Sequence, residues 1–332
     1  MTLGSFMPLS SSWPAKLEAL AAELRGQKLT SELEVIVDPD RARDALGRLD
    51  AILALRLERE AYEAATSLKA VFVPFTGLNH LPTELFASRG VRAFNVHGNA
   101  ESVAQCAIAM TLAFYGRTIE YHNDLRQTKW HGFLVGAGAE DDWSSIYRRK
   151  AAVFGVGAIG SAIARVLKAF DCTVVGYRRR ADLPTPPYFD RIESNLRQAV
   201  RDAELFFVAL PLTQATTGLF SKEILREAQG KFLVNVGRGP VVDEEGLYLA
   251  LKEGVLKGAA IDTWYDYPQE GSNSGAPSHF PIHELPNIVL SPHVGGSTRE
   301  AVSLNQGQTL ANIRSWITGE SCANEVDLRE LY

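Results

Sequence analysis

The chain has 332 residues, of which 46% are hydrophobic and 22% are charged, and its formal net charge is −5. This length accommodates two domains, the negative charge argues against a nucleic-acid-binding surface, and no apolar run approaches the ~20 residues of a membrane span. The first residues lack the basic start and apolar core of a signal peptide, so we expect a cytoplasmic protein. Three scattered cysteines, Cys106, Cys172 and Cys322, lack the spacing of a metal site, so we expect free thiols and no bound metal.

The N-terminal part of the chain predicts a parallel α/β sheet. Residues 14–98 contain helical patterns, such as Pro14–Leu24 and Leu81–Ser88. They alternate with four short strand patterns, which are Glu34–Val37, Ala51–Leu55, Ala70–Pro74 and Arg92–Val96. Alternation of this kind places helices on the faces of a parallel sheet. Residues 101–126 then predict a longer helix, and residues 131–148, rich in Gly, Ala and Asp, predict an irregular arm.

A glycine motif carries the strongest functional signal. The apolar run Ala151–Phe154 leads directly into Gly155, Gly157 and Gly160, which have G-x-G-x-x-G spacing, and a helical pattern and a second strand, Thr173–Tyr177, follow. In a dinucleotide site the first glycine permits a tight turn, the second lets the backbone approach a pyrophosphate, and the third lets the helix pack closely on the sheet. A purely structural turn is the alternative, and the strand–turn–helix–strand context favours the cofactor site over it.

Further strand patterns complete a second sheet, and they are Leu205–Ala209, Phe232–Val236, Ala259–Ile261 and Ile288–Leu290. Six strands with crossover helices are typical of a doubly wound dinucleotide-binding domain. The last helical pattern, Ser297–Thr318, has no strand partner left in this sheet. We therefore expect this helix to return and cover the first domain.

Three polar residues follow strands of the second sheet, where ligands bind in such folds. Arg238 lies between two glycines, and its guanidinium can hold a carboxylate with two parallel hydrogen bonds, although a capping or phosphate-contacting role is the alternative. Asp262 can accept a hydrogen bond from a nicotinamide amide or, alternatively, cap the next turn. His293 follows a proline and precedes two glycines, and it is suited to donate a proton at neutral pH, although a lone histidine is more often structural.

Five motifs in this order, GVGAIG, ALPLTQATTGLF, NVGRGPVVDEEGLYLAL, GAAIDTW and SPHVGGSTREA, resemble the D-isomer-specific 2-hydroxyacid dehydrogenase family. The resemblance runs from residue 68 to residue 330. It implies two doubly wound parallel-sheet α/β domains: a flavodoxin-like substrate domain, 1–98 plus 298–332, and a Rossmann NAD(P)-binding domain, 99–297. It also implies a homodimer joined through the cofactor domains, with the 101–126 helix and the 131–148 arm in the interface.

The same resemblance implies residue roles. Arg238 is expected to bind the substrate carboxylate and polarise the carbonyl, and His293 to act as the acid–base. The backbone N–H groups of a substrate loop are expected to hold the carboxylate, and this loop is Phe75, Thr76, Gly77, Leu78 and Asn79. The expected cofactor-binding residues are Val103, which would pack against the nicotinamide, and Gly155, Gly157, Ala158, Ile159, Gly160, Tyr177, Arg178, Arg179, Leu210, Pro211, Thr216, Val236, Gly237, Asp262, His293 and Gly295.

Two departures from the family pattern affect the chemistry. The family places a glutamate five residues after the nicotinamide aspartate, where it pairs with the histidine. This chain has Tyr267 at that position, and we expect Tyr267 to take part in catalysis. Since a phenol is uncharged at neutral pH, we expect reduction to fall off at lower pH than in glutamate-bearing relatives. NAD sites also place an acid after the second strand. Here Arg178 is followed by Arg179 and Arg180, which favours NADP over NAD, with a solvated basic turn as the alternative.

The sequence therefore predicts an NAD(P)-dependent enzyme that transfers a hydride between the nicotinamide and a small 2-oxoacid or D-2-hydroxyacid. Several apolar and aromatic residues could line the substrate pocket or, equally, pack in a core, and they are Phe75, Leu78, Trp264, Tyr265 and Tyr267. The alternative function is a catalytically weak regulatory protein that senses dinucleotides with the same fold.

Overall fold

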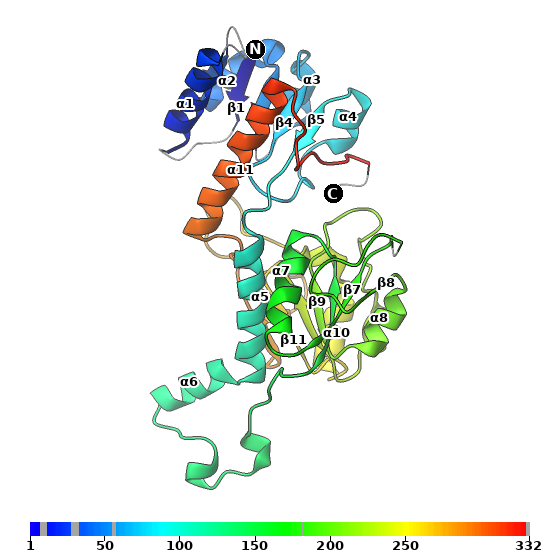
Figure 1. The fold of residues 1–332 in the computed structure, drawn as a ribbon. Coiled ribbons are helices and arrows are strands. Elements are labelled where there is room, and N and C mark those ends of the chain that lie inside the picture. The colour runs from blue at the N-terminus through cyan, green and yellow to red at the C-terminus, as the bar shows by residue number, and fades with distance from the viewer. Residues whose placement is uncertain (7–11, 28–32, 55–57, 181, 330–332) are drawn as a thin grey trace. The chain divides into compact units, whose positions relative to one another are not determined.

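The computed structural model describes residues 1–6, 12–27, 33–54, 58–180 and 182–329, and it separates into two compact units (Figure 1). The first unit combines Met1–Asn99 with Arg299–Tyr332, so both ends of the chain contribute to it, and the second unit is Ala100–Thr298. Each unit is an α/β structure built on a parallel sheet, which is the expected fold class.

In its described residues the first unit has a five-stranded sheet in the order β2-β1-β3-β4-β5, which is the flavodoxin-like order. The strands are β1 (Thr2–Ser5), β2 (Glu34–Ile36), β3 (Ala51–Leu53), β4 (Ala70–Phe72) and β5 (Arg92–Phe94). The helices are α1 (Ser12–Gly26), α2 (Pro39–Asp44), α3 (Arg59–Ala64), α4 (Thr83–Ser88) and α11 (Arg299–Thr318).

Different helices cover the two faces of this sheet. Helices α1 and α11 share an apolar cluster with Leu3, Phe72 and Phe94, whereas α2, α3 and α4 pack with alternate strand residues such as Ile52 and Val71. The strands are apolar on both faces because both faces are buried. The C-terminal helix therefore belongs to the first unit, which confirms the expectation drawn from its lack of a strand partner.

Strand β1 corrects the predicted four-stranded sheet. Of its residues, TLGS, only Leu3 is a large apolar residue, so the strand lacks an apolar run, but all four are buried, with β2 and β3 paired on either side. The other predicted strands are present and shorter than expected. The predicted end of the second of them, Leu55, lies outside the described residues.

The second unit has, in the part of the chain that is described, a seven-stranded sheet in the order β12-β11-β10-β9-β6-β7-β8. The strands are β6 (Lys150–Phe154), β7 (Thr173–Tyr177), β8 (Arg191–Glu193), β9 (Leu205–Val208), β10 (Phe232–Asn235), β11 (Gly258–Ile261) and β12 (Ile288–Leu290). The helices are α5 (Ala100–Tyr115), α6 (Thr118–Arg126), α7 (Ala158–Lys168), α8 (Leu196–Asp202), α9 (Lys222–Arg226) and α10 (Glu244–Lys252). If the strands are renumbered 1 to 7 from β6, the order is 7-6-5-4-1-2-3. This is the Rossmann order with β12 added at one edge.

Helices α5 and α7 cover one face of this sheet, and α8, α9 and α10 cover the other. Short 3-10 helices lie at Leu46–Arg48, Phe133–Val135, Ala139–Asp141, Gly239–Val241 and Ile282–Glu284. None of the helices in the described ranges combines the length and apolar character needed to span a bilayer.

Two details of the second unit correct the sequence-based expectation. Strand β8 adds a seventh strand at the edge of the sheet, where pairing with β7 alone leaves its polar residues partly exposed. The predicted 101–126 helix is two helices, α5 and α6. Arg117, between them, adopts a left-handed conformation with φ 48°, which interrupts the helical backbone.

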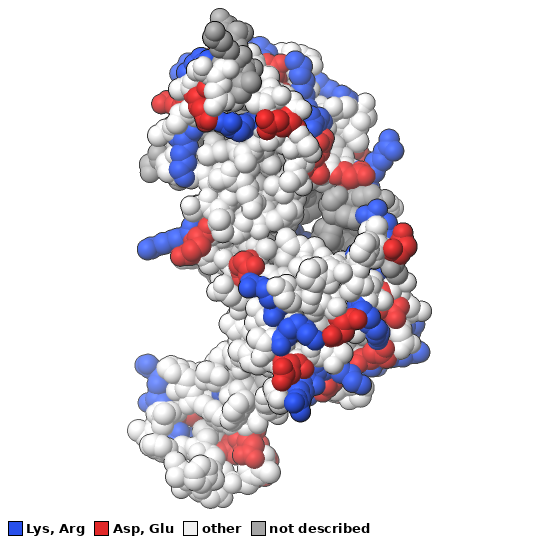
Figure 2. All heavy atoms as spheres, in the orientation of Figure 1, with Lys and Arg blue, Asp and Glu red and all other residues white. Residues whose placement is uncertain are grey.

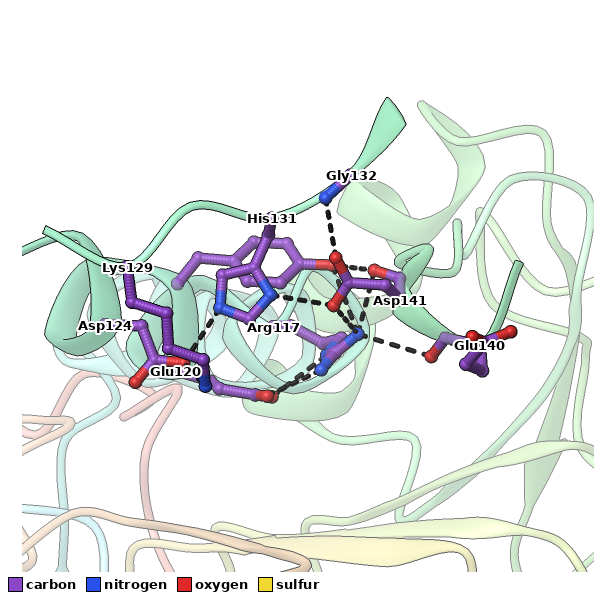
Figure 3. Close-up of polar contacts among 9 residues, drawn as sticks. Arg117, Glu120, Asp124, Lys129, His131, Gly132, Glu140 and Asp141 are labelled. Carbon is purple, nitrogen blue, oxygen red and sulfur yellow. Dashed lines mark hydrogen bonds and ion pairs between the residues drawn. The ribbon is translucent and has the colours of Figure 1, made fainter. Parts of the chain in front are cut away.

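An arm formed by α6 and residues 127–147 extends from the second unit, drawn in blue-green in Figure 1. No described residue of α6 is buried, and the arm is held by a charged cluster instead (Figure 3). His131 lies with Nδ1 2.7 Å from Asp141 Oδ1 and with Nε2 2.8 Å from Asp124 Oδ2. Only an imidazolium donates from both nitrogens, and the two carboxylates raise the pKa of His131 accordingly. Arg117 adds a bond to Asp141 O (2.8 Å).

The apolar residues of this arm face outward. The exposed fractions are 59% for Trp130, 86% for Phe133, 72% for Leu134 and 61% for Trp143. Figure 2 shows the arm, at the bottom of the view, as mostly uncharged surface with a few acidic and basic groups. Exposed apolar surface of this kind marks an interaction site.

Candidate active site

The loop after β6 has the geometry of a phosphate-binding turn. Gly155 adopts φ 100°, and a Cβ there would lie 2.7 Å from Ala209 O, so both conformation and space exclude a side chain. A Cβ on Gly160 would lie 1.8 Å from Gly155 O, so α7 packs directly against the turn. At Gly157, the N-cap residue of α7, a Cβ would meet no described atom within 4 Å. This open space lies at a helix N-terminus, whose N–H groups lack intrahelical partners, so the residues fit a dinucleotide pyrophosphate.

Other predicted cofactor contacts lie beside this turn. Ala158–Ile159 form the first turn of α7, and Leu210–Pro211 follow β9. The Thr216 hydroxyl donates to Pro211 O (2.6 Å), and its oxygen accepts from the Thr213 N–H (2.8 Å). These bonds close the loop after β9 and fix its backbone near the carboxyl end of β6.

The end of β7 carries the predicted adenosine-side residues. Tyr177 is a buried strand residue whose ring packs against Phe154, with centroids 5.5 Å apart. The Arg178 guanidinium turns back onto its own loop, where it donates to the carbonyl oxygens of Leu183 and Pro184. Arg179 is exposed at the surface. Arg178 is therefore hydrogen-bonded to its own loop, and Arg179 is exposed.

Arg238 follows β10 in an extended conformation and is half-buried. Asn235 ties its turn together, because the side-chain amide donates to Arg238 O (3.0 Å) and accepts from the Gly237 N–H (3.1 Å). Val236 is buried in the core, and a Cβ on Gly237 would lie 2.6 Å from Leu210 O. Desolvation lowers the pKa of Arg238, but an arginine remains charged in proteins. A charged, partly desolvated guanidinium at a strand end is suited to bind a carboxylate.

Asp262 holds the turn that carries His293. This buried carboxylate accepts hydrogen bonds from Ser291 Oγ (2.5 Å), Val294 N (3.0 Å) and Gly295 N (3.2 Å). His293 itself has φ 60°, a left-handed conformation that residues other than glycine rarely adopt. The bonds to Asp262 stabilise that conformation. A carboxylate has four lone-pair sites, so this arrangement leaves Asp262 with capacity for an amide donor.

His293 faces Tyr267 and lies close enough to Arg238 for the guanidinium charge to act on it. The rings of His293 and Tyr267 have centroids 5.4 Å apart at 45°. The His293 ring is exposed at the surface of the unit, yet partial desolvation lowers its pKa, the Arg238 charge lowers it further, and Asp262 opposes both. Desolvation raises the pKa of Tyr267, so the phenol is uncharged near neutral pH. The second unit thus brings together the guanidinium, the imidazole and the phenol.

The predicted substrate loop Phe75–Asn79 lies in the first unit, after β4. The Thr76 hydroxyl donates to Val96 O (3.0 Å), and the side-chain amide of Asn95 donates to Thr76 O (2.9 Å). Leu78 is buried in the core of that unit. The loop is therefore anchored to the residues after β5. Leu78 packs in the core, which is one of the two alternatives, pocket lining or core packing, that the sequence left open.

Sequence reasoning missed the side chains that hold these turns. Asn235 and Ser291 make the bonds that shape the Arg238 and His293 turns, and polar residues at the ends of apolar strands were the available signal.

Trp264 is buried, and its indole donates to Ser291 O (2.8 Å). Val103 is likewise buried, in α5. The tertiary structure therefore makes Trp264 and Val103 core residues of the second unit.

Comparison with known proteins identifies the family. Residues 108–295 match the family model described as D-isomer specific 2-hydroxyacid dehydrogenase, NAD binding domain. The glyoxylate reductase of Thermofilum pendens is 29% identical over 284 residues, which cover 82% of this chain and 79% of that protein. Glyoxylate/hydroxypyruvate reductase B of Pectobacterium carotovorum is 26% identical over 92% of this chain and 94% of its own.

Solved structures share the fold. The NADPH-dependent glyoxylate/hydroxypyruvate reductase of Sinorhizobium meliloti, solved with citrate, has a TM-score of 0.76 at 23% identity over 98% of both chains. A D-lactate dehydrogenase from Aquifex aeolicus, complexed with NAD and lactic acid, has a TM-score of 0.74 at 18% identity over 96% of both chains. Because the family model spans more than half of the sequence, the chain belongs to the D-isomer specific 2-hydroxyacid dehydrogenase family of NAD(P)-dependent enzymes.

Proposed function

We propose that the protein reduces a small 2-oxoacid, of the size of glyoxylate or hydroxypyruvate, to the D-2-hydroxyacid with NADPH. The observation that carries this proposal is the grouping of Arg238, His293 and Tyr267 in the unit that also holds the open glycine loop. Relatives named as glyoxylate and glyoxylate/hydroxypyruvate reductases support the substrate class. The rival interpretation, a dinucleotide sensor without turnover, finds no support among these relatives.

In this proposal Arg238 binds the substrate carboxylate and its charge polarises the carbonyl. The nicotinamide, when bound, supplies the hydride that adds to the carbonyl carbon. As the new C–H bond forms, the carbonyl π electrons move to the oxygen, and the His293 imidazolium gives its proton to that oxygen and becomes neutral. The Phe75–Asn79 loop would supply backbone N–H donors for the carboxylate.

A substrate panel tests the proposed function. The purified protein would be assayed with glyoxylate, hydroxypyruvate, pyruvate and phenylpyruvate, each with NADPH and with NADH, by following the absorbance of the reduced cofactor. Phenylpyruvate probes a larger apolar substituent. Turnover of a small 2-oxoacid supports the proposal, whereas dinucleotide binding without turnover of any of the four compounds would replace it with a sensor.

The pH dependence of reduction tests the role of Tyr267. Reduction needs the imidazolium, so kcat/KM falls as pH rises through the pKa of His293, which desolvation and Arg238 lower. A carboxylate beside the ring favours the imidazolium, so we expect Tyr267→Glu to move this alkaline limb upward by about 1 pH unit or more. Tyr267→Gln is the matched control, because it makes the same change of shape without the charge. An equal shift in both variants would exclude a charge effect.

The preference for NADPH is proposed from the basic residues after β7. Arg179 is exposed just after β7, and we expect its guanidinium to pair with the 2′-phosphate. Loss of one charge-assisted bond costs about 1.5–3 kcal/mol, so Arg179→Glu should lower kcat/KM for NADPH about 10–100-fold and spare NADH. Arg226→Glu, an equal charge change at an exposed position of α9, is the control. An equal loss with both cofactors, or a wild-type preference for NADH, would contradict the assignment.

We also propose that two copies of the chain associate through α5, α6 and the arm. The arm exposes Phe133 and Leu134, and a pocket of about 530 Å³ lies at its root, lined in part by Phe114, Ile119 and Ile288. A two-fold dimer brings the same surface of each subunit together, so one patch of this kind on each chain is sufficient.

A further inference from the structure

Trp264 lies between the two turns that carry Arg238 and His293. Its side chain is buried, and the indole Nε1–H donates to Ser291 O at 2.8 Å, two residues before the histidine. On its other side, a Cβ on Gly239, the residue after the arginine, would lie 2.3 Å from Trp264 O. The backbone at Trp264 is therefore in direct contact with the arginine turn while its side chain bonds to the histidine turn.

A third contact joins Trp264 to Tyr267. The Trp264 backbone N–H donates to the Tyr267 hydroxyl at 3.0 Å, and the Tyr267 ring is the one that faces His293. Trp264 therefore contacts Gly239 next to Arg238, donates to Ser291 two residues before His293, and bonds directly to the Tyr267 hydroxyl.

The indole N–H is the group that a purely apolar residue would lack. A phenylalanine could occupy the same apolar cluster with Ile261 and Ile282, but it could not donate to Ser291 O. Ser291 is otherwise bonded to the end of β11, through its N–H to Ile261 O (2.9 Å) and its hydroxyl to Asp262. Without the indole the Ser291 carbonyl would be a buried acceptor without a donor among the described residues, and the peptide after it would rotate to find one.

We propose that Trp264 is a positioning residue that sets the orientation of the His293 ring relative to Arg238, through its bond to Ser291 O and its backbone contact with Gly239. This inference rests on the roles proposed above for His293 and Arg238. Trp264 touches neither substrate nor cofactor in the proposal, and it acts only through the two turns.

The charged and titratable groups around His293 make its orientation measurable. Arg238 after β10 and Asp262 after β11 act on its charge, and the Tyr267 ring faces it. Cys106 on α5 lies beside the same turn, with its Sγ 3.3 Å from where a Cβ on Gly295 would lie. Desolvation and the Arg238 charge both lower the pKa of His293. A relaxed turn lets the ring move toward water and away from the guanidinium, and both changes raise that pKa.

The test compares Trp264→Phe with the wild-type protein. We expect kcat to fall about 10-fold or more, the KM for the dinucleotide to stay within about 3-fold, and the His293 pKa, followed by NMR titration, to rise by about 0.5 or more. Trp13→Phe is the matched control, because it removes a buried indole from the first unit. It should leave the His293 titration unchanged. An equal shift in both variants, or no shift in Trp264→Phe, would overturn the proposal.

The NMR titration does not depend on turnover. If no 2-oxoacid is reduced, the proposed function fails while the positioning of His293 is still measured. A second readout needs no Trp264 variant at all: in the wild-type protein the indole N–H signal of Trp264 should shift with the same midpoint as the His293 ring. That shift should disappear in His293→Gln. An indole signal that is insensitive to the His293 titration would also overturn the proposal.

Discussion

Replacing Gly160 with alanine is expected to lower the unfolding temperature by roughly 6–12 °C, because overpacking at this contact costs about 3 kcal/mol. The new Cβ would lie 1.8 Å from the Gly155 carbonyl oxygen. Both groups are fixed by the backbone of β6 and α7, so α7 must move away from the sheet to relieve the clash. Thermal unfolding followed by circular dichroism measures the effect, and dinucleotide titration should show weakened binding as well.

Gly157→Ala is the matched substitution in the same loop. Its Cβ would meet no described atom within 4 Å, so the change in unfolding temperature should be no more than roughly 2–4 °C, which is the cost of a poorer N-cap residue. The methyl group would occupy the space into which a pyrophosphate fits, so the dinucleotide Kd should rise about 10-fold or more. Wild-type dinucleotide affinity in this variant would show that the loop is not the pyrophosphate site.

The second large effect is expected on turnover. His293→Gln removes the proton donor and keeps a polar side chain, so kcat should fall about 10²–10⁴-fold. Arg238→Lys keeps the charge but loses the two-pronged donor, so kcat/KM for the 2-oxoacid should fall about 10²–10³-fold. Steady-state kinetics over a range of oxoacid concentrations measures both effects.

Controls for these substitutions lie on the surface of the same unit. His283→Gln changes an exposed histidine, and Arg226→Lys changes an exposed arginine, so both should keep wild-type kinetics. The alkaline limb of the pH–rate profile should also disappear in His293→Gln, because no imidazolium is left to titrate. Activity of this variant within about 3-fold of wild type would place the proton donor elsewhere.

The fold class could be predicted because parallel strands that are buried on both faces appear as apolar runs. Residues 151–154 and 232–234 are examples, and both lie in interior strands of the second sheet. Strands β1 and β8 could not be predicted this way. The first has a single large apolar residue, Leu3, among small and polar ones, and the second is an edge strand with two charged residues.

The break between α5 and α6 had a local signal that the periodicity obscured. Gly116 and Thr118 flank Arg117, and glycine at a helix end followed by threonine at a helix start is a common boundary pattern. The helical pattern continues on both sides, so residues 101–126 are expected to form one helix from spacing alone. The left-handed backbone at Arg117 decides the outcome, because it directs α6 out of the line of α5.

The sequence by itself determined the fold class, the glycine turn and the strand-end positions of Arg238, Asp262 and His293, because turns and buried strands are encoded by neighbouring residues. Only the tertiary structure decided that Asp262 holds the His293 turn, that Arg178 bonds to its own loop, and that Tyr177 is buried. The physical reason is that hydrogen-bond partners and core contacts join residues from different strands. They become neighbours only when the parallel sheet assembles, and no local pattern records which of them will meet.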